Sequence, residues 1–403
     1  MPSGAHVYGP VVSGKSDREA LLSPAFVRVA AANFFFFLTF ASFFLLPLHV
    51  RALGGSERTV GFVMGTNGVA GLVSVFLLGP LLDRYDRRIF LRGGILVMMV
   101  ATLGYLAVDR IGPLLFVLRI VQGVAFAAGF NAASTLAAEL APPARRAAAL
   151  GLFGVSTLGT HALAPTIGEQ VIRLGGFPTL FVVAAGYSIV ALLLTIGIPS
   201  SRHGDAAETP ALAFRGTLAV TIVVVALAGV AFGTVITFIP TFVHHEARLG
   251  SVSTFFLAYT AAAIATRFGA AGLGDTFGYR RVIMPALGLL SLAIAALATV
   301  HSMSALAVTG LVFGTAQGIA YPTLNAFAIE HAAARQLGRL QTLFNGAFNL
   351  GVTAGSFVLG VVADAYGHRL VFLCAAATAA VAVLLFALGT RGDRVSRMPR
   401  LTG

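Results

Sequence analysis

Two ionisable residues lie well inside long apolar stretches of the sequence. A third, Arg267, lies near the end of the stretch 251–274, where its side chain can extend to the membrane surface. Arg119 lies in the stretch near 111–138, and His161 lies in the stretch near 147–172. A charged or titratable group at such a depth usually faces the protein interior and marks a path for substrate or protons. Histidine titrates near neutral pH, so His161 could relay protons, and a neutral, hydrogen-bonded histidine is an equally good interpretation. For Arg119 the structural alternative is an arginine bonded to carbonyls of a neighbouring helix.

The composition explains why these stretches belong in lipid. Charged residues make up 10% of the 403 residues, whereas soluble domains carry about 25%, and 57% of the residues are hydrophobic. Too few polar groups remain to cover a compact body in water, so we expect an integral membrane protein and not an enzyme. The single cysteine, Cys374, excludes an internal disulfide and a multi-thiolate metal site. We expect no catalytic site, no metal and no cofactor.

Twelve stretches are long enough to cross a membrane, which takes roughly 20 apolar residues each. Their hydrophobicity is continuous and does not alternate, so we predict an all-α membrane protein and not a β-barrel. The first 24 residues are polar and show no obvious cleavage site, so we expect no removable signal peptide. The predicted spans are 29–50, 60–82, 93–108, 111–138, 147–172, 177–199, 216–243, 251–274, 282–300, 304–329, 340–363 and 370–389.

The basic residues predict the orientation. Most of the 27 Lys and Arg residues fall in the gaps on one side, if the N-terminus is placed on that side. Cytoplasmic loops are enriched in Lys and Arg, so we expect both termini in the cytoplasm. We interpret the net charge of +12 through these loops and expect no nucleic-acid partner. The expected location is a bacterial inner (plasma) membrane.

The chain repeats itself. The segment Asp83–Arg88 after span 2 recurs as Asp275–Arg280 after span 8, and Gln122 with its following glycine recurs at Gln317. We therefore expect two pseudo-symmetric six-helix bundles. The predicted organisation is a cytoplasmic tail at 1–24, a bundle at 25–199, a cytoplasmic linker at 200–215, a bundle at 216–389 and a cytoplasmic tail at 390–403.

A finer repeat divides each half into units of three spans. Asp364, Gly367 and Arg369 follow span 11 with the same spacing as Asp275, Gly278 and Arg280, but on the opposite membrane face, and Glu169 holds the matching place after span 5. Such 3+3 inverted repeats are typical of secondary transporters, whose substrate sites lie near the midplane between the halves.

At these residues the chain resembles the major facilitator superfamily. Residues 79–88 (GPLLDRYDRR) resemble the family signature G-x-L-x-D-R-x-G-R-[RK], with Asp86 in place of a glycine. Leu115, Arg119, Gln122 and Gly123 resemble the span-4 motif L-x-x-x-R-x-x-Q-G of proton-coupled drug and metabolite antiporters. Residues 164–169 (APTIGE) partly resemble the span-5 motif G-P-x-x-G-G.

The resemblance implies a secondary active transporter that works by alternating access, with the two halves rocking around a central cavity. Proton-coupled efflux of a small amphiphilic drug or metabolite is the function it favours. A lipid or lysolipid translocase, or an uptake symporter or facilitator, would use the same fold. The expected partners are a small-molecule substrate, protons and membrane lipids, and we expect a monomer.

By the same resemblance, spans 1, 4, 7 and 10 line the cavity. The sequence offers no carboxylate in the middle of a span, so a cation would lack a counter-charge, and neutral, zwitterionic or anionic amphiphiles are favoured. For any single aromatic residue, packing is the commoner role. The candidate substrate-binding residues are Asn33, Phe37, Arg119, Gln122, Phe126, Asn131, Thr234, Thr237, Gln317, Tyr321 and Asn325.

Two further sets of residues could couple motion to transport. The proton-coupling candidates are Arg119, His161, Glu139 and Glu169, although the repeat favours a structural or latch role for Glu169. Charge pairs near helix ends can break and re-form as the halves rock, which would make a conformational latch. Solvated loop charges are the alternative. The latch candidates are Asp83, Arg84, Arg87, Arg88, Asp275 and Arg280.

Overall fold

The computed structural model describes residues 23–142, 146–200, 216–269, 272–333 and 336–391, and every element in these ranges is helical. Most of the predicted tails and linker lies outside these ranges. The elements are α1 (Pro24–Ser42), η2 (Phe43–Leu45), α2 (Leu46–Ala52), α3 (Glu57–Arg84), α4 (Arg87–Gly104), η3 (Tyr105–Ala107), α5 (Pro113–Leu140), α6 (Arg146–Leu194), α7 (Gly216–Thr241), η5 (Phe242–Glu246), α8 (Ser253–Gly269), α9 (Leu273–Phe277), α10 (Tyr279–Leu297), α11 (Met303–Glu330), α12 (Leu337–Tyr366) and α13 (His368–Gly389).

These helices make twelve crossings, as predicted. In the part of the chain that the structure describes, ten helical segments are long and apolar enough to span a membrane. One of them, α6, has 49 residues and is divided at Gly176, whose φ of 73° and ψ of −173° are not helical, so it supplies two crossings. The twelfth crossing is α8, which has only 17 residues.

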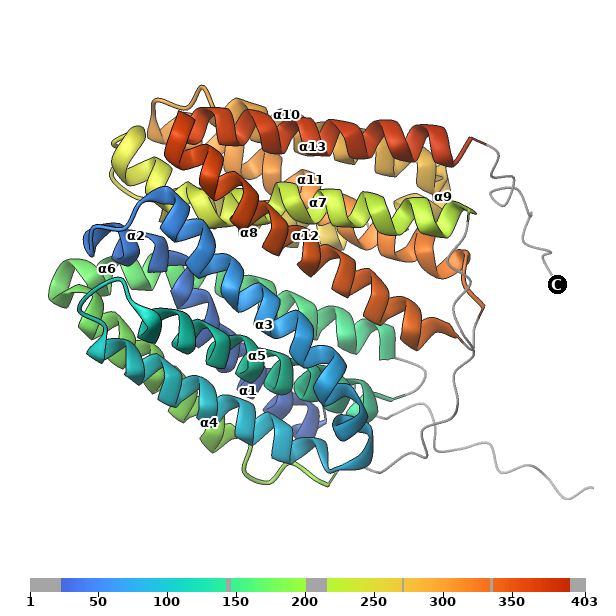
Figure 1. Ribbon diagram of the computed structural model, residues 1–403. Coiled ribbons are helices and arrows are strands. Elements are labelled where there is room, and N and C mark those ends of the chain that lie inside the picture. The colour runs from blue at the N-terminus through green and yellow to red at the C-terminus, as the bar shows by residue number, and fades with distance from the viewer. Residues whose placement is uncertain (1–22, 143–145, 201–215, 270–271, 334–335, 392–403) are drawn as a thin grey trace, which may run out of the picture.

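The crossings form two six-helix bundles, α1 to α6 and α7 to α13 (Figure 1). We call the end where α1 begins and α13 ends the terminal end, and the other the opposite end. The bundles meet mainly where α3 packs on α12 and α6 packs on α8. In Figure 1, α3 and α12 diverge toward the terminal end.

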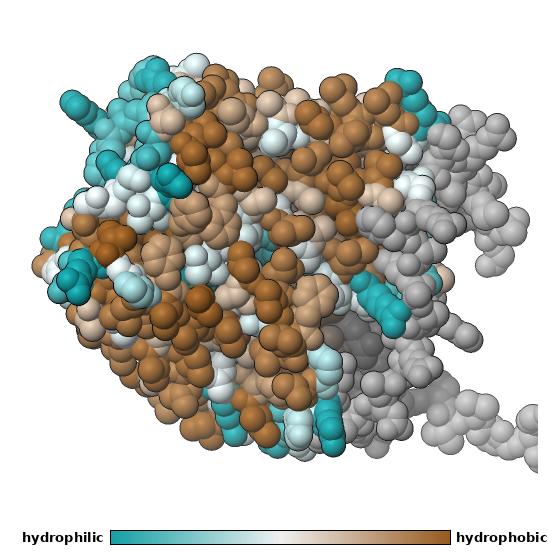
Figure 2. Space-filling model, in the orientation of Figure 1, coloured by the Kyte–Doolittle hydropathy of each residue, from teal (hydrophilic) through white to brown (hydrophobic). Residues whose placement is uncertain are grey.

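The outer surface suits a lipid environment. Figure 2 shows hydrophobic residues across the middle of the visible face and hydrophilic residues toward the ends. Large apolar side chains are exposed there, among them Phe76 and Leu77 on α3, each 67% exposed. Exposed apolar area of this extent is unfavourable in water and favourable in a bilayer.

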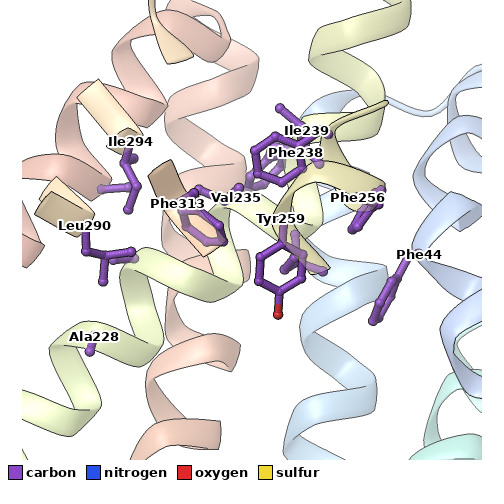
Figure 3. Packing of buried hydrophobic residues seen from close by; sticks show 14 of the residues in the cluster. Phe44, Ala228, Val235, Phe238, Ile239, Phe256, Tyr259, Leu290, Ile294 and Phe313 are labelled. Carbon is purple, nitrogen blue, oxygen red and sulfur yellow. The ribbon is translucent and has the colours of Figure 1, made fainter. Parts of the chain in front are cut away.

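The second bundle packs around α7. This helix is apolar on all sides, and most of its residues are buried because α12 and α13 pack along it and α10 and α11 also contact it. Phe313 of α11 and Tyr259 of α8 pack together with ring centroids 5.5 Å apart, and Phe44 of η2 stacks on Phe256 across the bundle interface at 5.8 Å (Figure 3). An aromatic contact therefore joins the two bundles.

The repeated D-x-x-G-x-R segments have a backbone reason for their glycines. Gly278 and Gly367 join successive helices with φ of 89° and 82°, a left-handed conformation that glycine adopts without strain. Asp86, which replaces the glycine in the first copy, has φ of −59° and instead caps α4 by accepting from the Arg88 backbone N–H at 3.0 Å. Asp86 therefore joins α3 to α4 in a backbone conformation that does not require glycine.

Glycines let α3 and α12 approach closely near the opposite end. A Cβ atom on Gly61 would lie 2.3 Å from the carbonyl oxygen of Ser356 and 2.9 Å from the Cα atom of Gly360. No side chain can be added there without moving the helices apart.

We predict that Gly61→Ala opens the opposite end, because the added methyl group overpacks the α3–α12 contact by about 1–3 kcal/mol. Hydrogen–deuterium exchange of peptides from α3 and α12 near this contact should become faster. Gly93→Ala is the matched control, since a Cβ atom there meets nothing within 4 Å. Equal exchange in Gly61→Ala and the wild type would contradict the prediction.

Candidate functional site

Arg119 lies in a buried polar cluster of the first bundle. It is 3% exposed, and its guanidinium donates to the Val63 carbonyl at 3.2 Å and to Gln122 Oε1 at 3.0 Å. The Tyr105 hydroxyl donates to the same Gln122 oxygen at 3.0 Å, and Asn67 Nδ2 donates to the Arg119 carbonyl at 3.2 Å. The guanidinium joins α5 to α3, as in the alternative interpretation of Arg119 as an arginine bonded to a carbonyl of a neighbouring helix. Contact of Arg119 with substrate stays a prediction.

Aromatic side chains of α1 and α5 form a second cluster, the phenylalanine cluster, made of Phe37, Phe40, Phe126 and Phe130. Phe37 lies 5.4 Å from Phe126 and 5.6 Å from Phe130, and Phe40 stacks on Phe126 at 4.2 Å. His161 of α6 packs against the edge of this cluster, 5.9 Å from Phe37. On its other side His161 meets Tyr259 of α8, 6.1 Å away in the second bundle. His161 therefore lies where the bundles face each other.

Two predicted cavity asparagines of the first bundle make local bonds. Asn33 Nδ2 donates to Thr157 Oγ1 of α6 at 2.9 Å, and Asn131 Nδ2 donates to the Ala127 carbonyl of its own helix at 2.7 Å. Asn33 is fully buried, whereas Asn131 is partly exposed. Of the two, Asn131 is the better placed to reach a ligand.

In the second bundle, the predicted polar residues of α11 face α12. Gln317 and Tyr321 line a small cavity of about 10 Å³, and Tyr321 donates to Asn345 Oδ1 at 2.7 Å. Asn325 and Gln341 exchange two hydrogen bonds, each of 3.0 Å. The sequence analysis did not single out the α12 amides, which complete this polar surface.

The two predicted threonines of α7 contact other groups within the same bundle. Thr234 donates to the Val230 carbonyl at 2.7 Å, and Thr237 shares a 2.8 Å hydrogen bond with Ser356 of α12. Both are buried. The Thr237 bond supports packing of α7 on α12, whereas the Thr234 bond stays within α7.

At the opposite end, Glu169 of the first bundle accepts hydrogen bonds from the second. Its carboxylate accepts from the backbone N–H groups of Val252 at 2.9 Å and Ser253 at 3.1 Å, and from the hydroxyls of Ser251 and Ser253. His244 Nε2 lies 3.1 Å away. A carboxylate from α6 thus caps the N-terminus of α8, where the helix dipole favours negative charge.

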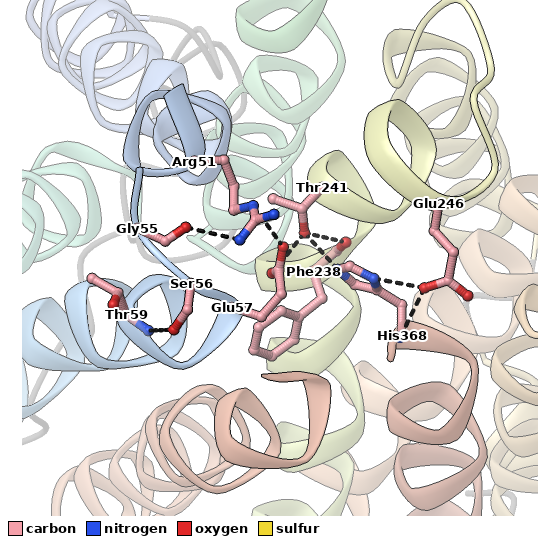
Figure 4. A network of polar contacts seen from close by, with 9 residues as sticks. All are labelled: Arg51, Gly55, Ser56, Glu57, Thr59, Phe238, Thr241, Glu246 and His368. Carbon is pink, nitrogen blue, oxygen red and sulfur yellow. Dashed lines mark hydrogen bonds and ion pairs between the residues drawn. The ribbon is translucent and has the colours of Figure 1, made fainter. Parts of the chain in front are cut away.

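A second polar network, centred on Glu57, joins the bundles at this end (Figure 4). Glu57 of α3 accepts from Thr241 of α7 at 3.0 Å and lies 3.3 Å from His368 Nε2 of α13. Arg51 pairs with Glu57 at 3.4 Å from within the first bundle, and Glu246 lies 2.8 Å from His368 Nδ1. We call the Glu169 and Glu57 networks together the polar closure.

The predicted latch residues lie at the terminal end and bind within their own bundles. Arg88 Nη1 donates to the Ile198 carbonyl at 3.1 Å, and in the second bundle Arg280 Nη1 donates to the Thr390 carbonyl at 3.5 Å. The equivalence of these two bonds bears out the internal repeat. Arg87 pairs with Glu139 of α5, one of the proton-coupling candidates.

The remaining latch candidates also stay local. Asp275 accepts from Tyr279 at 2.6 Å, and Arg84 lies exposed over the ring of Tyr85. Asp83 lies in the last turn of α3, and its side chain lies outside the described part of the structure. Between described residues, no hydrogen bond or ion pair joins the bundles at the terminal end, so a latch role for these residues stays a prediction.

The sequence also matches a known family. The family model of the Major Facilitator Superfamily matches residues 29–355 and, in a second match, residues 221–400. The chain belongs to the major facilitator superfamily. It is therefore a transporter and not an enzyme.

Relatives and solved structures agree with this assignment. The multi-drug resistance efflux pump PmrA of Streptococcus pneumoniae is 26% identical over 361 residues, which cover 83% of this chain and 89% of PmrA. The multidrug resistance protein MdtG of Citrobacter koseri is 25% identical over 363 residues, covering 83% and 88%. A bacterial homologue of the human lysosomal transporter Spinster, in an inward-facing and unoccupied conformation, superposes with a TM-score of 0.77 at 14% identity, covering 93% of this chain and 98% of that one.

Several residues of this superfamily transporter escaped the sequence analysis. Glu57, His244 and His368 lie at the ends of apolar stretches, where they look like ordinary loop residues. Arg267, near the end of α8, looked like a residue that extends toward the membrane surface, and its side chain instead lies against Gly154 of α6. For His368, the one signal in the sequence is its place between Gly367 and Arg369, in the segment that repeats the D-x-x-G-x-R spacing.

For Arg119 we predict a loss of stability on substitution. Arg119→Ala removes the bonds to Val63 and Gln122 and leaves a buried cavity, at a cost of about 2–4 kcal/mol. Arg267→Ala removes no hydrogen bond between described residues and should unfold near the wild-type temperature. Thermal unfolding in detergent compares the two variants, and equal melting temperatures would contradict the structural role of Arg119.

Proposed function

We propose that this transporter exports small amphiphilic molecules by alternating access, coupled to protons. The observation that carries the proposal is the polar closure at the opposite end. Glu169 and Glu57 bind across the bundle interface there, whereas at the terminal end no hydrogen bond or ion pair between two described residues crosses that interface. A transporter that opens to one side at a time needs this asymmetry.

The chemistry of the polar closure suits a gate. Its bonds are directional, and their donors and acceptors can be hydrated when the bundles separate, so opening exchanges protein partners for water at small net cost. An apolar contact of the same size would lose its hydrophobic stabilisation on opening. The polar closure can therefore break and re-form as the bundles rock.

The direction of transport rests on two arguments. The relatives PmrA and MdtG are named as multidrug efflux and resistance proteins. The excess of basic residues predicts that the terminal end faces the cytoplasm. With the opposite end closed, the state seen here would then load substrate from the cytoplasm, as export requires.

Proton coupling is proposed through His368. Both ring nitrogens face acceptors, since Nδ1 lies 2.8 Å from Glu246 and Nε2 lies 2.9 Å from Thr241 and 3.3 Å from Glu57. A ring that donates from both nitrogens is the protonated form. A proton taken up from the opposite side therefore favours the closed opposite end and returns the transporter to its loading state. Other charged or titratable groups around this site are Arg51, His245 and Arg369.

The direct test of export uses purified protein in proteoliposomes and a panel of cationic, neutral and anionic amphiphiles. When the solution at the opposite end is acidic, we expect at least one compound to accumulate on that side against its concentration gradient. We expect a protonophore to abolish this accumulation. Transport of the compounds at the same rate with and without the pH gradient would contradict proton coupling and favour a facilitator. Absence of movement for every compound would contradict the proposed function.

The role of His368 predicts a particular pH profile. Wild-type export should rise as the pH on the opposite side falls, because protonation of His368 favours the loading state. His368→Gln keeps a hydrogen-bonding group without a titrating charge and should flatten the profile. His331→Gln, at the terminal end, is the control and should keep the wild-type profile. A wild-type profile in His368→Gln would disprove this assignment.

One observation keeps lipid translocation as a second candidate. A groove of about 410 Å³ runs between α3, α5 and α12, and exposed apolar side chains such as Val73, Leu77 and Ile120 line it. An acyl chain would fit such a surface. Transfer of a labelled lysolipid by the purified protein, faster than in protein-free vesicles, would support this candidate.

A further inference from the structure

Arg267 is held at the interface between the bundles. It follows Tyr259 and Ala263 at intervals of four residues, so the three side chains share one face of α8. Tyr259 meets His161 of α6 on this face. Arg267 meets α6 two turns closer to the terminal end, where a Cβ atom on Gly154 would lie 3.1 Å from Nη1. The guanidinium thus lies against the other bundle.

The charge of Arg267 has no counterpart among the described residues. No carboxylate of a described residue lies within ion-pair distance of Arg267, and its Nε is buried without an acceptor among those residues. The two glutamates that cross the interface, Glu57 and Glu169, lie at the opposite end and already have several donors. A partly buried cation without hydrogen bonds is unfavourable, so an anion that reached Arg267 would gain a strong charge-assisted bond.

The surroundings of Arg267 fit the rest of an amphiphile. Phe153, which precedes Gly154 in α6, packs against Phe130 of the phenylalanine cluster at 6.4 Å. On the side of the second bundle, Tyr321 and Asn345 offer hydrogen-bonding groups, and the Tyr321 hydroxyl donates to Asn345 Oδ1 at 2.7 Å. The site combines one cation, an aromatic surface and hydrogen-bonding groups.

We infer that Arg267 binds the anionic group of an amphiphilic substrate, while the phenylalanine cluster contacts its apolar part. The inference rests on the proposed function and gives its substrate class. It assigns the anion to Arg267 and not to Arg119, because the Arg119 guanidinium is already bonded to Val63 and Gln122 and is 3% exposed. A carboxylate or sulfonate on an aromatic skeleton matches the site.

The test uses matched pairs of aryl carboxylates and their neutral carboxamides, such as naphthylacetate and naphthylacetamide, in the proteoliposome assay. Arg267→Gln should transport the carboxylates about tenfold or more slowly than the wild type does, because the charge partner is lost. Transport of the carboxamides should stay within about twofold, since hydrophobic contacts carry their binding. Arg267→Lys should retain part of the carboxylate transport, because it keeps a point charge without the planar fork.

Arg281→Gln is the matched control. It removes an exposed arginine at the same end of the molecule and should transport both members of each pair like the wild type. Two outcomes would overturn the anion site and leave the proposed function standing. In the first, Arg267→Gln transports the carboxylates as the wild type does. In the second, the wild-type protein transports the neutral carboxamides but not the carboxylates. Absence of transport for every compound, charged or neutral, would overturn the proposed function and the anion site with it.

Discussion

The capping of α8 by Glu169 is the interaction on which the arrangement of the two bundles depends. A single carboxylate from α6 accepts two backbone N–H groups and two hydroxyls of the other bundle. These donors would otherwise be left unsatisfied at a helix N-terminus, away from bulk water. The bond set therefore fixes α6 against α8, and the contacts of Phe44 with Phe256 and of His161 with Tyr259 follow along the same pair of helices.

The Glu57 network also joins the bundles, by binding α3 to α7 and α13. Glu57 begins α3, and its partners Thr241 and His368 come from α7 and α13. The close glycine contact of Gly61 with Ser356 lies one turn farther along α3. The Glu57 network and the glycine contact one turn away thus hold the same end closed. A change that weakens one of them should also weaken the other.

Much of this fold could be predicted from sequence, because its causes are local. Apolar stretches of sufficient length predict the crossings, and the recurrence of Asp83–Arg88 at Asp275–Arg280 predicts the two halves. The fold places Arg88 and Arg280 on equivalent carbonyls, which bears out that repeat. The site was harder to predict, because its contacts join residues far apart in the chain. Spacing within one helix cannot show that Val63 accepts from Arg119 or that Glu57 meets His368.

The two arginines show this limit most clearly. By position in its span, Arg119 is the deeper charge and the stronger candidate for substrate binding, yet its donors have protein acceptors. Arg267 lies near the end of its helix, where the sequence favours a side chain that extends to the membrane surface, yet its buried Nε has no acceptor among the described residues. Which cation is available to a ligand depends on its neighbours in space and not on its depth.

The most direct test of the account measures distances across both ends of the molecule by pulsed electron paramagnetic resonance. Spin labels at the exposed positions Arg58 and Tyr366 report the opposite end, and labels at Tyr85 and Phe277 report the terminal end, in a Cys374→Ala background. Glu169→Gln cannot accept every donor of α8, so the opposite-end distance should lengthen while the terminal-end distance shortens. If neither distance changes, or if both change in the same direction, the polar closure does not control alternating access.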